Sequence, residues 1–149
     1  MSMSIVLGKA CIFTLGQTIE LNSLEITGFL VDHSTSTKTH GFLIKEKSKK
    51  IIYAPDFRNI PKSSFKFLRN ADLAIFDGSC FFPAGPARFG HMAMRESIKL
   101  AKKLKIKQVY YTHIGHGPRM NTHKVLEEKV QELGGKNFHI AWDGLEIMI

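Results

Sequence analysis

The sequence predicts an α/β fold in which a mixed sheet carries helices on one face. Segments rich in β-branched and aromatic residues alternate with amphipathic ones along the 149 residues, without a linker, repeat or low-complexity stretch. A strand over residues 72–76 is followed by a helix and then by a strand over 106–112, which is the crossover that joins parallel strands. We therefore expect one domain over residues 1–149, long enough to bury a core.

The first half of the chain predicts mainly antiparallel strands. Residues 10–14 and 18–21 are expected to form a hairpin about Gly16, followed by a strand over 24–31 and a polar loop over 34–39. Strands over 41–45 and 50–54 are joined by the charged turn 46–49, which favours an antiparallel pair. A short helix over 63–68 follows Pro61, a residue suited to a first helical turn.

The second half predicts helices between strands. The strand over 72–76 leads into an irregular loop over 79–89 with Pro83, Gly85 and Pro86. An amphipathic helix follows His91; its apolar stripe is Met92, Ile98, Leu100, Ala101 and Leu104. After the strand over 106–112, a helix over 123–133 ends at two glycines. Strands over 138–142 and 145–149 are expected to close the chain as a hairpin around Asp143 and Gly144.

Composition narrows the class of protein. Charged residues make up 23% of the chain and no run of about 18 apolar residues occurs, which predicts no membrane span. Cys11 and Cys80 are not in a CxxC spacing and the N-terminus lacks a secretory pattern, so we expect a cytoplasmic protein with reduced thiols. The net charge of +8 either attracts nucleic acid or reflects an ordinary lysine-rich surface. The lack of aromatic residues among the lysines favours the second interpretation.

Ionisable residues follow the ends of several predicted strands. His33, Asp56, Asp77 and His113 each stand one or two residues beyond such an end. Taken singly, an aspartate there is usually a turn residue and a histidine usually a satisfied core residue. Four coincidences, with His91 and His116 nearby, instead indicate a metal site at one edge of the sheet. Imidazoles with a carboxylate suit Zn, Mn or Fe(II), and no cysteine is placed to compete.

Five motifs carry a resemblance to a known family. They are VDHS at 31–34, IIYAPDF at 51–57, GH at 90–91, THIGH at 112–116 and AWDGLEI at 141–147. Together they resemble the metallo-β-lactamase superfamily, nearest to the cyclic phosphodiesterase of phosphonate breakdown and more distantly to the tRNA 3′-processing endonuclease. The resemblance runs from about Gly16 to Ile149 and implies a metallo-β-lactamase-like αββα sandwich with two metal ions between its stacked sheets.

The resemblance also implies roles for single residues. His33 would bind the first metal, Asp56 would bridge both metals and His113 would bind the second. His91 would be a catalytic residue beside them, donating a proton to the leaving oxygen or holding a phosphate oxygen. Two cations about 3.5–4 Å apart can clamp the attacking and leaving oxygens, with Asp56 central to that chemistry. No ligand role carries over to Asp77 or His116; for His116 we expect hydrogen bonding behind the ligands.

The superfamily's main metal motif, HxHxDH, does not occur in these 149 residues. The resemblance is therefore to the C-terminal half of the sandwich, and three protein ligands are too few for two metals. A half-sandwich would leave one sheet face open, including apolar residues from 24–31 and 51–54. We expect the chain not to be a monomer, pairing either with a copy of itself or with a missing N-terminal half.

Two functions stay open from the sequence. The first is a metal-dependent hydrolase, phosphodiesterase-like and acting on a phosphate-containing substrate, with an incomplete dinuclear site and a divalent metal (Zn, Mn or Fe) that is partly bound or absent. The second is a truncated, non-catalytic module that binds a partner protein or nucleic acid. The absence of HxHxDH favours the second for the isolated chain. The joint presence of His33, Asp56, His91 and His113 favours the first for the parent family.

Overall fold

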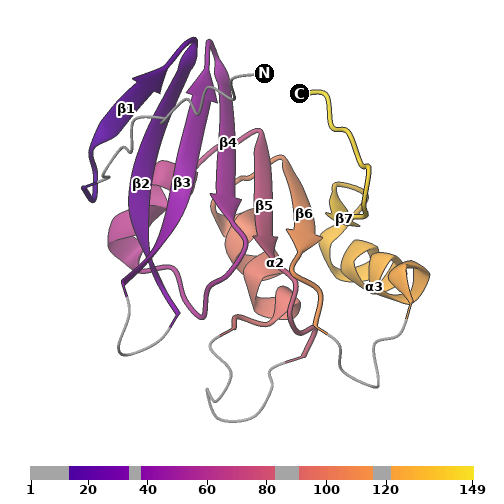
Figure 1. Ribbon diagram of the computed structural model, residues 1–149. Coiled ribbons are helices and arrows are strands. Elements are labelled where there is room, and N and C mark those ends of the chain that lie inside the picture. The colour runs from indigo at the N-terminus through magenta and orange to yellow at the C-terminus, as the bar shows by residue number, and fades with distance from the viewer. Residues whose placement is uncertain (1–13, 34–37, 83–90, 116–121) are drawn as a thin grey trace, which may run out of the picture.

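The computed structural model describes residues 14–33, 38–82, 91–115 and 122–149, and their strands form one seven-strand mixed sheet in sequence order (Figure 1). The strands are β1 (Thr18–Leu21), β2 (Leu24–Asp32), β3 (Lys38–Glu46), β4 (Lys49–Ala54), β5 (Leu73–Asp77), β6 (Gln108–Thr112) and β7 (Phe138–Ile140). Strands β1 to β4 are antiparallel neighbours, whereas β4 to β7 run parallel. Because parallel strands end at the same edge, the residues after β4, β5 and β6 meet there.

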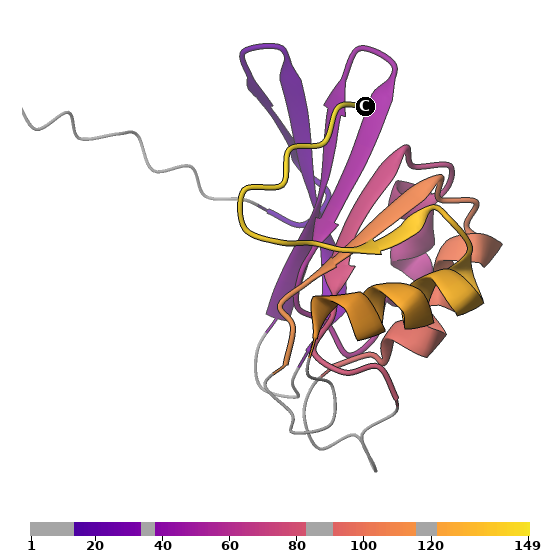
Figure 2. The same cartoon turned by 90° about the vertical axis from the view of Figure 1, so that its right-hand side faces the viewer.

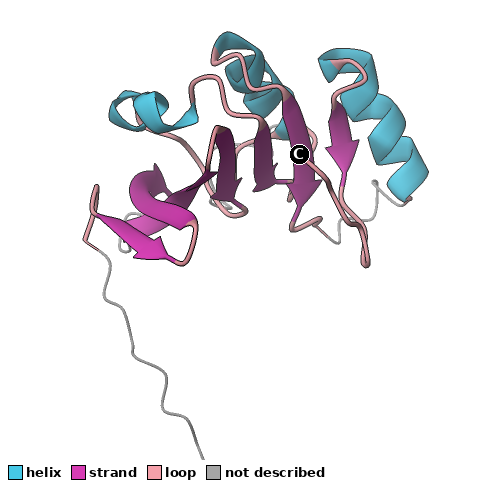
Figure 3. Cartoon of the chain, turned by 90° about the horizontal axis from the view of Figure 1, so that it is seen from above, coloured by secondary structure: helices cyan, strands magenta, loops and turns pink. Residues whose placement is uncertain are grey.

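The helices all lie on one face of this sheet, as the views in Figure 2 and Figure 3 show. A 3₁₀ turn, η1 (Lys62–Ser64), runs into α1 (Phe65–Leu68), and the longer helices are α2 (Met94–Lys103) and α3 (His123–Gly134). The predicted α/β fold with helices on one face is thus confirmed. None of the described helices is long and apolar enough to cross a membrane.

The core lies between the helices and the sheet. Side chains facing the helices alternate along the strands with side chains facing away, because successive residues of a strand point to opposite faces. Phe29, Ile52, Phe76 and Tyr111 are examples on the helix side, and none of them has exposed surface. Position 41 favours glycine, because a Cβ there would lie 2.5 Å from the buried ring of Phe29 and would collide with it.

Helix α2 is held to β6 by a buried polar contact as well as by apolar packing. The Tyr111 hydroxyl lies 2.9 Å from Ser97 Oγ, which also donates to the Met94 carbonyl oxygen. Burial raises the pKa of the Tyr111 phenol, and the Ser97 hydrogen bond opposes that shift only in part. The phenol is therefore a neutral structural group.

The opposite side of the sheet, which we call the open face, carries no described helix and is turned toward the viewer in Figure 1. Strand register places twelve large apolar side chains on it, and none of them belongs to the core cluster of the described residues. They are Ile19, Leu21, Leu24, Ile26, Leu30, Phe42, Ile44, Ile51, Tyr53, Leu73, Ile75 and Tyr110. The expectation of an open apolar face holds for alternate residues only, since Phe29, Val31, Ile52 and Ala54 face the helices.

Three sequence expectations need correction or fall outside the described residues. The loop expected over 34–39 is shorter, because β3 begins at Lys38 and pairs with Asp32. Residues 18–21 form β1 as expected but pair with β2, and residues 10–13 of the expected first hairpin lie outside the described part of the chain. Most of the loop expected over 79–89 lies outside it too.

The predicted C-terminal hairpin does not form, so that prediction is wrong. The turn at Asp143 and Gly144 does form, with the Leu145 amide donating to the Trp142 carbonyl oxygen at 3.1 Å. However, β7 ends at Ile140 and pairs with β6 in parallel, and residues 145–149 form no strand. A turn dipeptide fixes the local reversal only; β7 spans three residues and offers too short an edge for a returning strand.

Candidate metal centre

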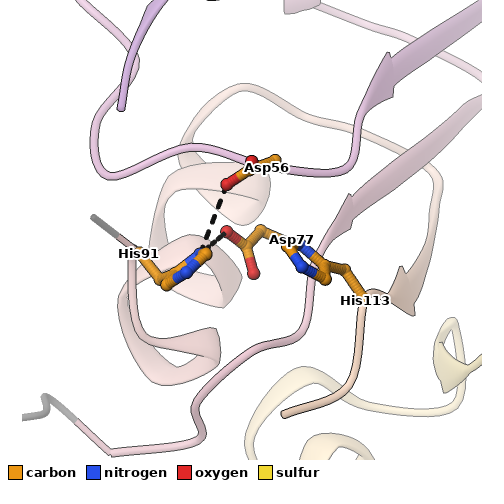
Figure 4. Close-up of side chains that lie close together, drawn as sticks. All are labelled: Asp56, Asp77, His91 and His113. Carbon is orange, nitrogen blue, oxygen red and sulfur yellow. Dashed lines mark hydrogen bonds and ion pairs between the residues drawn. The ribbon is translucent and has the colours of Figure 1, made fainter. Parts of the chain in front are cut away.

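A cluster of imidazoles and carboxylates lies at the edge of the sheet where β4, β5 and β6 end (Figure 4). Asp56, Asp77, His91 and His113 each offer one ligand atom, and these four atoms lie within 4.8 Å of one another. Asp56 follows β4, Asp77 ends β5, His113 follows β6, and His91 stands just before α2. Three strand ends and the segment leading into α2 therefore converge on one point.

Asp77 is the most enclosed member of the cluster, with no exposed side-chain surface. Its Oδ2 accepts from the Phe57 amide at 3.0 Å and lies 2.7 Å from His91 Nδ1, while Oδ1 accepts from the Ser79 amide at 2.8 Å. Since a buried carboxylate is stable only when its oxygens are satisfied, these contacts explain how it is accommodated. Asp77 consequently joins the segments after β4 and β5 to the segment before α2.

His91 Nδ1 is hydrogen-bonded to the Asp77 carboxylate. An ionised carboxylate can only accept, so a hydrogen bond at 2.7 Å assigns the hydrogen to Nδ1. The Met92 amide donates to the Phe57 carbonyl oxygen at 2.7 Å, which fixes the backbone next to His91. With Nδ1 engaged and the side chain 20% exposed, Nε2 is the atom that remains for a substrate or a proton.

Asp56 has an oxygen that the described residues leave unsatisfied. Its Oδ1 lies 3.2 Å from His33 Nδ1 and 3.4 Å from His91 Nδ1. Neither contact has hydrogen-bond geometry, and Oδ1 is a buried atom without a hydrogen-bond partner among the described residues. A buried carboxylate oxygen among imidazoles is the environment that a cation would complete.

His33 belongs to the same cluster by distance, although it is not one of the four atoms within 4.8 Å. Its ring centroid lies 5.3 Å from that of His91. The bridge between Asp32 and Asn59, with the Asn59 carbonyl accepting from the Asp32 amide at 2.8 Å, ties the chain after β4 to the end of β2. That tie brings His33 beside Asp56.

His113 adopts a left-handed backbone conformation with φ of 57°, which is uncommon outside glycine and asparagine. Its Nδ1 lies 3.2 Å from the Pro55 carbonyl oxygen, and Ser79 Oγ donates to the His113 carbonyl oxygen at 3.1 Å. A carbonyl accepts, so Nδ1 carries the hydrogen, and Nε2 is the ring nitrogen left to bind a metal.

The loop that carries His113 interlocks with the loop after β5. The Gly78 amide donates to the Thr112 carbonyl oxygen at 2.7 Å. A Cβ on Gly115 would lie 2.3 Å from the Ser79 carbonyl oxygen, and one on Gly78 would lie 2.6 Å from Ile114 Cδ1. Both glycines are therefore required by close approach, and the approach holds His113 over the cluster.

The sequence-predicted site residues are brought together. His33, Asp56, His91 and His113 meet at one edge, while their roles as ligands or catalysts stay predictions. Asp77, for which no role was assigned, is a central member of the cluster; its position after a strand was the signal, but its burial and its contact with His91 could not be read. His116 lies outside the described residues.

Comparisons with known proteins agree with this fold. A family model for the beta-lactamase superfamily domain matches residues 8–114. A diphosphatase from the PhnP family is 26% identical, with a TM-score of 0.68 over 89% of this chain and 46% of that one. YhfI from Bacillus subtilis, a metallo-β-lactamase fold protein, is 24% identical, with a TM-score of 0.74 over 92% and 54%.

Zn²⁺-bound PqqB from Methylobacterium extorquens is 20% identical, with a TM-score of 0.71 over 92% of this chain and 55% of that one. No curated protein sequence matches the chain closely enough to indicate a relative. The chain spans about half the length of these solved structures. The αββα sandwich is therefore represented here by one sheet and its helices.

Proposed function

The chain belongs to the beta-lactamase superfamily, and from this premise we propose that it is the metal-binding portion of a metal-dependent hydrolase that cleaves phosphodiester or diphosphate bonds. The observation that supports the proposal best is the cluster of Asp56, Asp77, His91 and His113, with an unsatisfied buried oxygen on Asp56 at its centre. Structural ion pairs alone rarely leave such an oxygen without a hydrogen bond.

The donor set fits a divalent transition metal. His33, Asp56 and His113 offer two imidazoles and one carboxylate, which suits Zn²⁺, Mn²⁺ or Fe²⁺. His91 and Asp77 are less suited to be ligands, because their closest polar atoms are bonded to each other at 2.7 Å. When bound, the metal would supply Lewis acidity toward a phosphoryl oxygen and neutralise negative charge there.

The Asp77–His91 pair is suited to move a proton. Asp77 fixes the imidazole orientation through Nδ1, so that Nε2 is the atom that would donate a proton to the oxygen that leaves phosphorus. A group in this position contributes typically about 10²–10⁴-fold to a rate. His91 is thus proposed as the catalytic acid and Asp77 as the residue that positions it.

Two observations support a phosphate-containing substrate. The 26% identical structure is a diphosphatase, and the net charge of +8 raises the local concentration of polyanions. The same charge would serve a nucleic acid, so the substrate class is proposed at the level of the phosphate ester. Mono- and dinucleotide esters are equally compatible with it.

The described ligands suffice for one metal ion but not for two. A catalytic zinc needs about three protein ligands, and His33, Asp56 and His113 are three. We therefore propose one weakly held ion in the isolated 149-residue chain, with turnover near background. A chain that binds neither metal nor substrate would instead act as the non-catalytic module that binds a partner protein or nucleic acid.

The test combines metal binding with turnover. Zn²⁺ and Mn²⁺ binding is measured by calorimetry on the metal-free protein, and hydrolysis of bis(4-nitrophenyl) phosphate by absorbance, for wild type, Asp56→Ala and His113→Ala. His40→Ala is the matched control, because His40 lies on β3 and is not one of the clustered residues.

We expect about one ion per chain, with affinity reduced at least tenfold in Asp56→Ala and His113→Ala and unchanged in His40→Ala. Equal affinities in all four proteins would contradict the assignment of the site. Two tightly bound ions with rapid turnover in the wild type would contradict the proposal that the site is incomplete.

A further inference from the structure

The helical side of the sheet has a hollow that is separate from the metal centre. Helices α2 and α3 lie next to each other there (Figure 2), and Lys102 Nζ on α2 donates to the Leu133 carbonyl oxygen on α3 at 2.6 Å. The hollow has a volume of about 230 Å³ and is lined by Phe81, Phe82, Arg95, Lys129, Glu132 and Leu133. Because it lies on the side that the helices cover, its exposure does not depend on what covers the open face.

Two phenyl rings form the apolar part of the hollow. The rings of Phe81 and Phe82 meet edge to face, with their centroids 5.1 Å apart. Arg95 Cζ lies 5.5 Å from the Phe82 centroid. Lys129 Nζ lies 5.5 Å from the Phe81 centroid and 5.7 Å from the Phe82 centroid. Phe81 is buried whereas Phe82 is 53% exposed, so the second ring offers its surface to a ligand.

The two cations are available to an anion. Neither Arg95 nor Lys129 makes an ion pair among the described residues, and Glu132 is the only acidic residue of the described lining. A cation over an exposed aromatic ring is held only weakly. The sequence does not reveal this grouping, because Lys129 and Arg95 lie on different helices and both are distant in the chain from the phenyl rings.

An exposed aromatic ring beside two cations is the combination that recognises single-stranded nucleic acids, whose bases stack on aromatic side chains while Lys and Arg hold the phosphates. We propose that the hollow binds one nucleotide unit of a single strand, with its base on Phe82 and the adjoining phosphates at Arg95 and Lys129. Base stacking is stronger than an exposed cation–π contact, so a base can replace a cation on the Phe82 ring and leave that cation for a phosphate.

The size of the hollow favours a nucleotide over a protein partner. Sites for drug-sized ligands measure about 300–1,000 Å³, so a hollow of about 230 Å³ holds a smaller group, such as one base. A stable protein interface takes about 20–30 residues from each partner, whereas six residues line this hollow. The net charge of +8 adds a longer-range attraction for a polyanion. An acidic peptide is the competing occupant, and the experiment separates the two.

The hollow and the metal centre share the segment that follows β5. Phe82 comes five positions after Asp77, so their Cα atoms are at most about 18 Å apart. The segment is fixed to the start of α2, because the Cys80 carbonyl oxygen accepts from the Met94 amide at 2.9 Å. A strand bound at Phe82 can therefore reach the metal centre within a few nucleotides. As a substrate subsite the hollow rests on the proposed function, which supplies the phosphodiester chemistry of the strand.

The first test measures binding to the metal-free protein in EDTA by fluorescence anisotropy. The probes are a labelled thymidine oligonucleotide of about 12 nucleotides and an abasic oligonucleotide of the same length, which keeps the phosphates but has no bases. Phe82→Ala removes the exposed ring and Phe82→Tyr keeps it. Trp142→Ala is the matched control, because Trp142 is 54% exposed and does not line the hollow.

We expect Phe82→Ala to weaken binding of the thymidine oligonucleotide at least fivefold, and Phe82→Tyr and Trp142→Ala to leave it unchanged. Binding of the abasic oligonucleotide should be the same in the wild type and all three variants. Equal losses on both probes in Phe82→Ala, or no loss on either, would overturn base stacking on Phe82.

Two competitors test the choice of ligand. Thymidine monophosphate should compete more weakly than the unlabelled oligonucleotide, and equal competition would overturn a strand as the ligand. A peptide of alternating Glu and Phe should also compete more weakly. Tighter binding of that peptide would overturn the nucleic acid and make an acidic protein segment the occupant.

A second measurement tests the cations. The logarithm of the binding constant falls with the logarithm of salt concentration by about 0.7 for each phosphate contact to a single strand. Arg95→Gln and Lys129→Gln should each reduce this slope by about 0.7. Lys66→Gln removes a cation that lies 5.0 Å from the Phe67 centroid on α1, and should leave the slope unchanged.

The same slope in all three lysine and arginine variants as in the wild type would overturn the phosphate contacts. Because every measurement is made without metal, failure here leaves the proposed metal binding at Asp56 untouched. Failure of metal binding likewise leaves binding at the hollow untouched, so the two proposals fail separately.

Discussion

Nδ1 of His91 lies 2.7 Å from Oδ2 of Asp77, a carboxylate with no exposed surface. The two residues are fourteen positions apart and come from the end of β5 and the segment before α2. Asp77 also accepts hydrogen bonds from the backbone amides of Phe57 and Ser79. It therefore has both a structural role in the loops after β4 and β5 and a contact with the proposed catalytic residue. The same carboxylate therefore holds together the segments that follow β4 and β5 and orients His91, the proposed catalytic acid.

Asp77→Asn should destabilise the protein by about 1–3 kcal/mol. One carboxylate oxygen becomes an NH₂ group, which faces at least one N–H donor and leaves it unsatisfied in a buried place. Urea denaturation at pH 7 measures the loss. Asp143→Asn, at an exposed turn, is the control and should change the free energy of unfolding by less than about 0.5 kcal/mol. Similar losses in the two variants would contradict the role given to Asp77.

Asp56→Ala should change stability in opposite directions with and without zinc. In the metal-free protein it removes a buried oxygen that has no hydrogen bond, so the variant should be as stable as wild type or more stable by up to about 1 kcal/mol. With free Zn²⁺ at about 100 times the wild-type dissociation constant, wild type should gain about 2.7 kcal/mol and the variant much less.

Thermal unfolding at pH 8, with and without Zn²⁺, measures both effects of Asp56→Ala. A clear loss of stability in the metal-free variant would show that Asp56 has a structural partner. A zinc-induced gain equal to that of wild type would remove Asp56 from the ligand set.

Gly115→Ala should cost more stability than Gly135→Ala, although only Gly135 has a positive φ, of 94°. The Cβ at 115 would lie 2.3 Å from the Ser79 carbonyl oxygen, so backbone must shift, whereas nothing lies within 4 Å of a Cβ at 135. We expect a loss above about 2 kcal/mol for Gly115→Ala, as for overpacking, and about 1 kcal/mol for Gly135→Ala.

Zinc affinity distinguishes a positioning effect from a general loss of stability at Gly115. His113 is two residues away, and its carbonyl oxygen accepts from Ser79 Oγ. Calorimetry should therefore show weaker binding for Gly115→Ala and unchanged binding for Gly135→Ala. Equal affinity in both would contradict the inference that the interlocked loops position His113.

The sequence predicted the sheet edge better than the C-terminus. Patterns of β-branched residues followed by His or Asp located the ends of β2, β4, β5 and β6 to within one residue. The site residues after them meet because parallel strands end at a common edge. Asp77 looked like a turn residue, since its burial and the approach of His91 depend on packing between residues fourteen positions apart. The Asp143–Gly144 pair gave a true turn without a hairpin, because pairing depends on a free strand edge that no local pattern encodes.

Asp72 should contribute stability at neutral pH that is lost in acid. Its Oδ1 accepts from Lys107 Nζ at 2.7 Å and its Oδ2 from the Lys50 amide at 2.9 Å. The Lys107 hydrogen bond lowers the pKa of the Asp72 carboxyl, against an opposing effect of burial, and the Lys50 amide lowers it further. A group whose pKa is lower in the folded state stabilises that state above its unfolded pKa, and the contribution disappears as the pH falls through the folded pKa.

Asp72→Asn should therefore cost about 0.5–1 kcal/mol at pH 7, a small value because Lys107 is largely exposed and the pair is screened by salt. The difference between wild type and variant should shrink as the pH is lowered from 7 into the acid range where Asp72 gains a proton. A series of urea denaturation curves from pH 7 downward measures this change. Lys107→Met should show the same convergence in acid, whereas Asp143→Asn should not. A difference that persists unchanged in acid would mean that Asp72 acts through shape or its backbone contact, not through its charge.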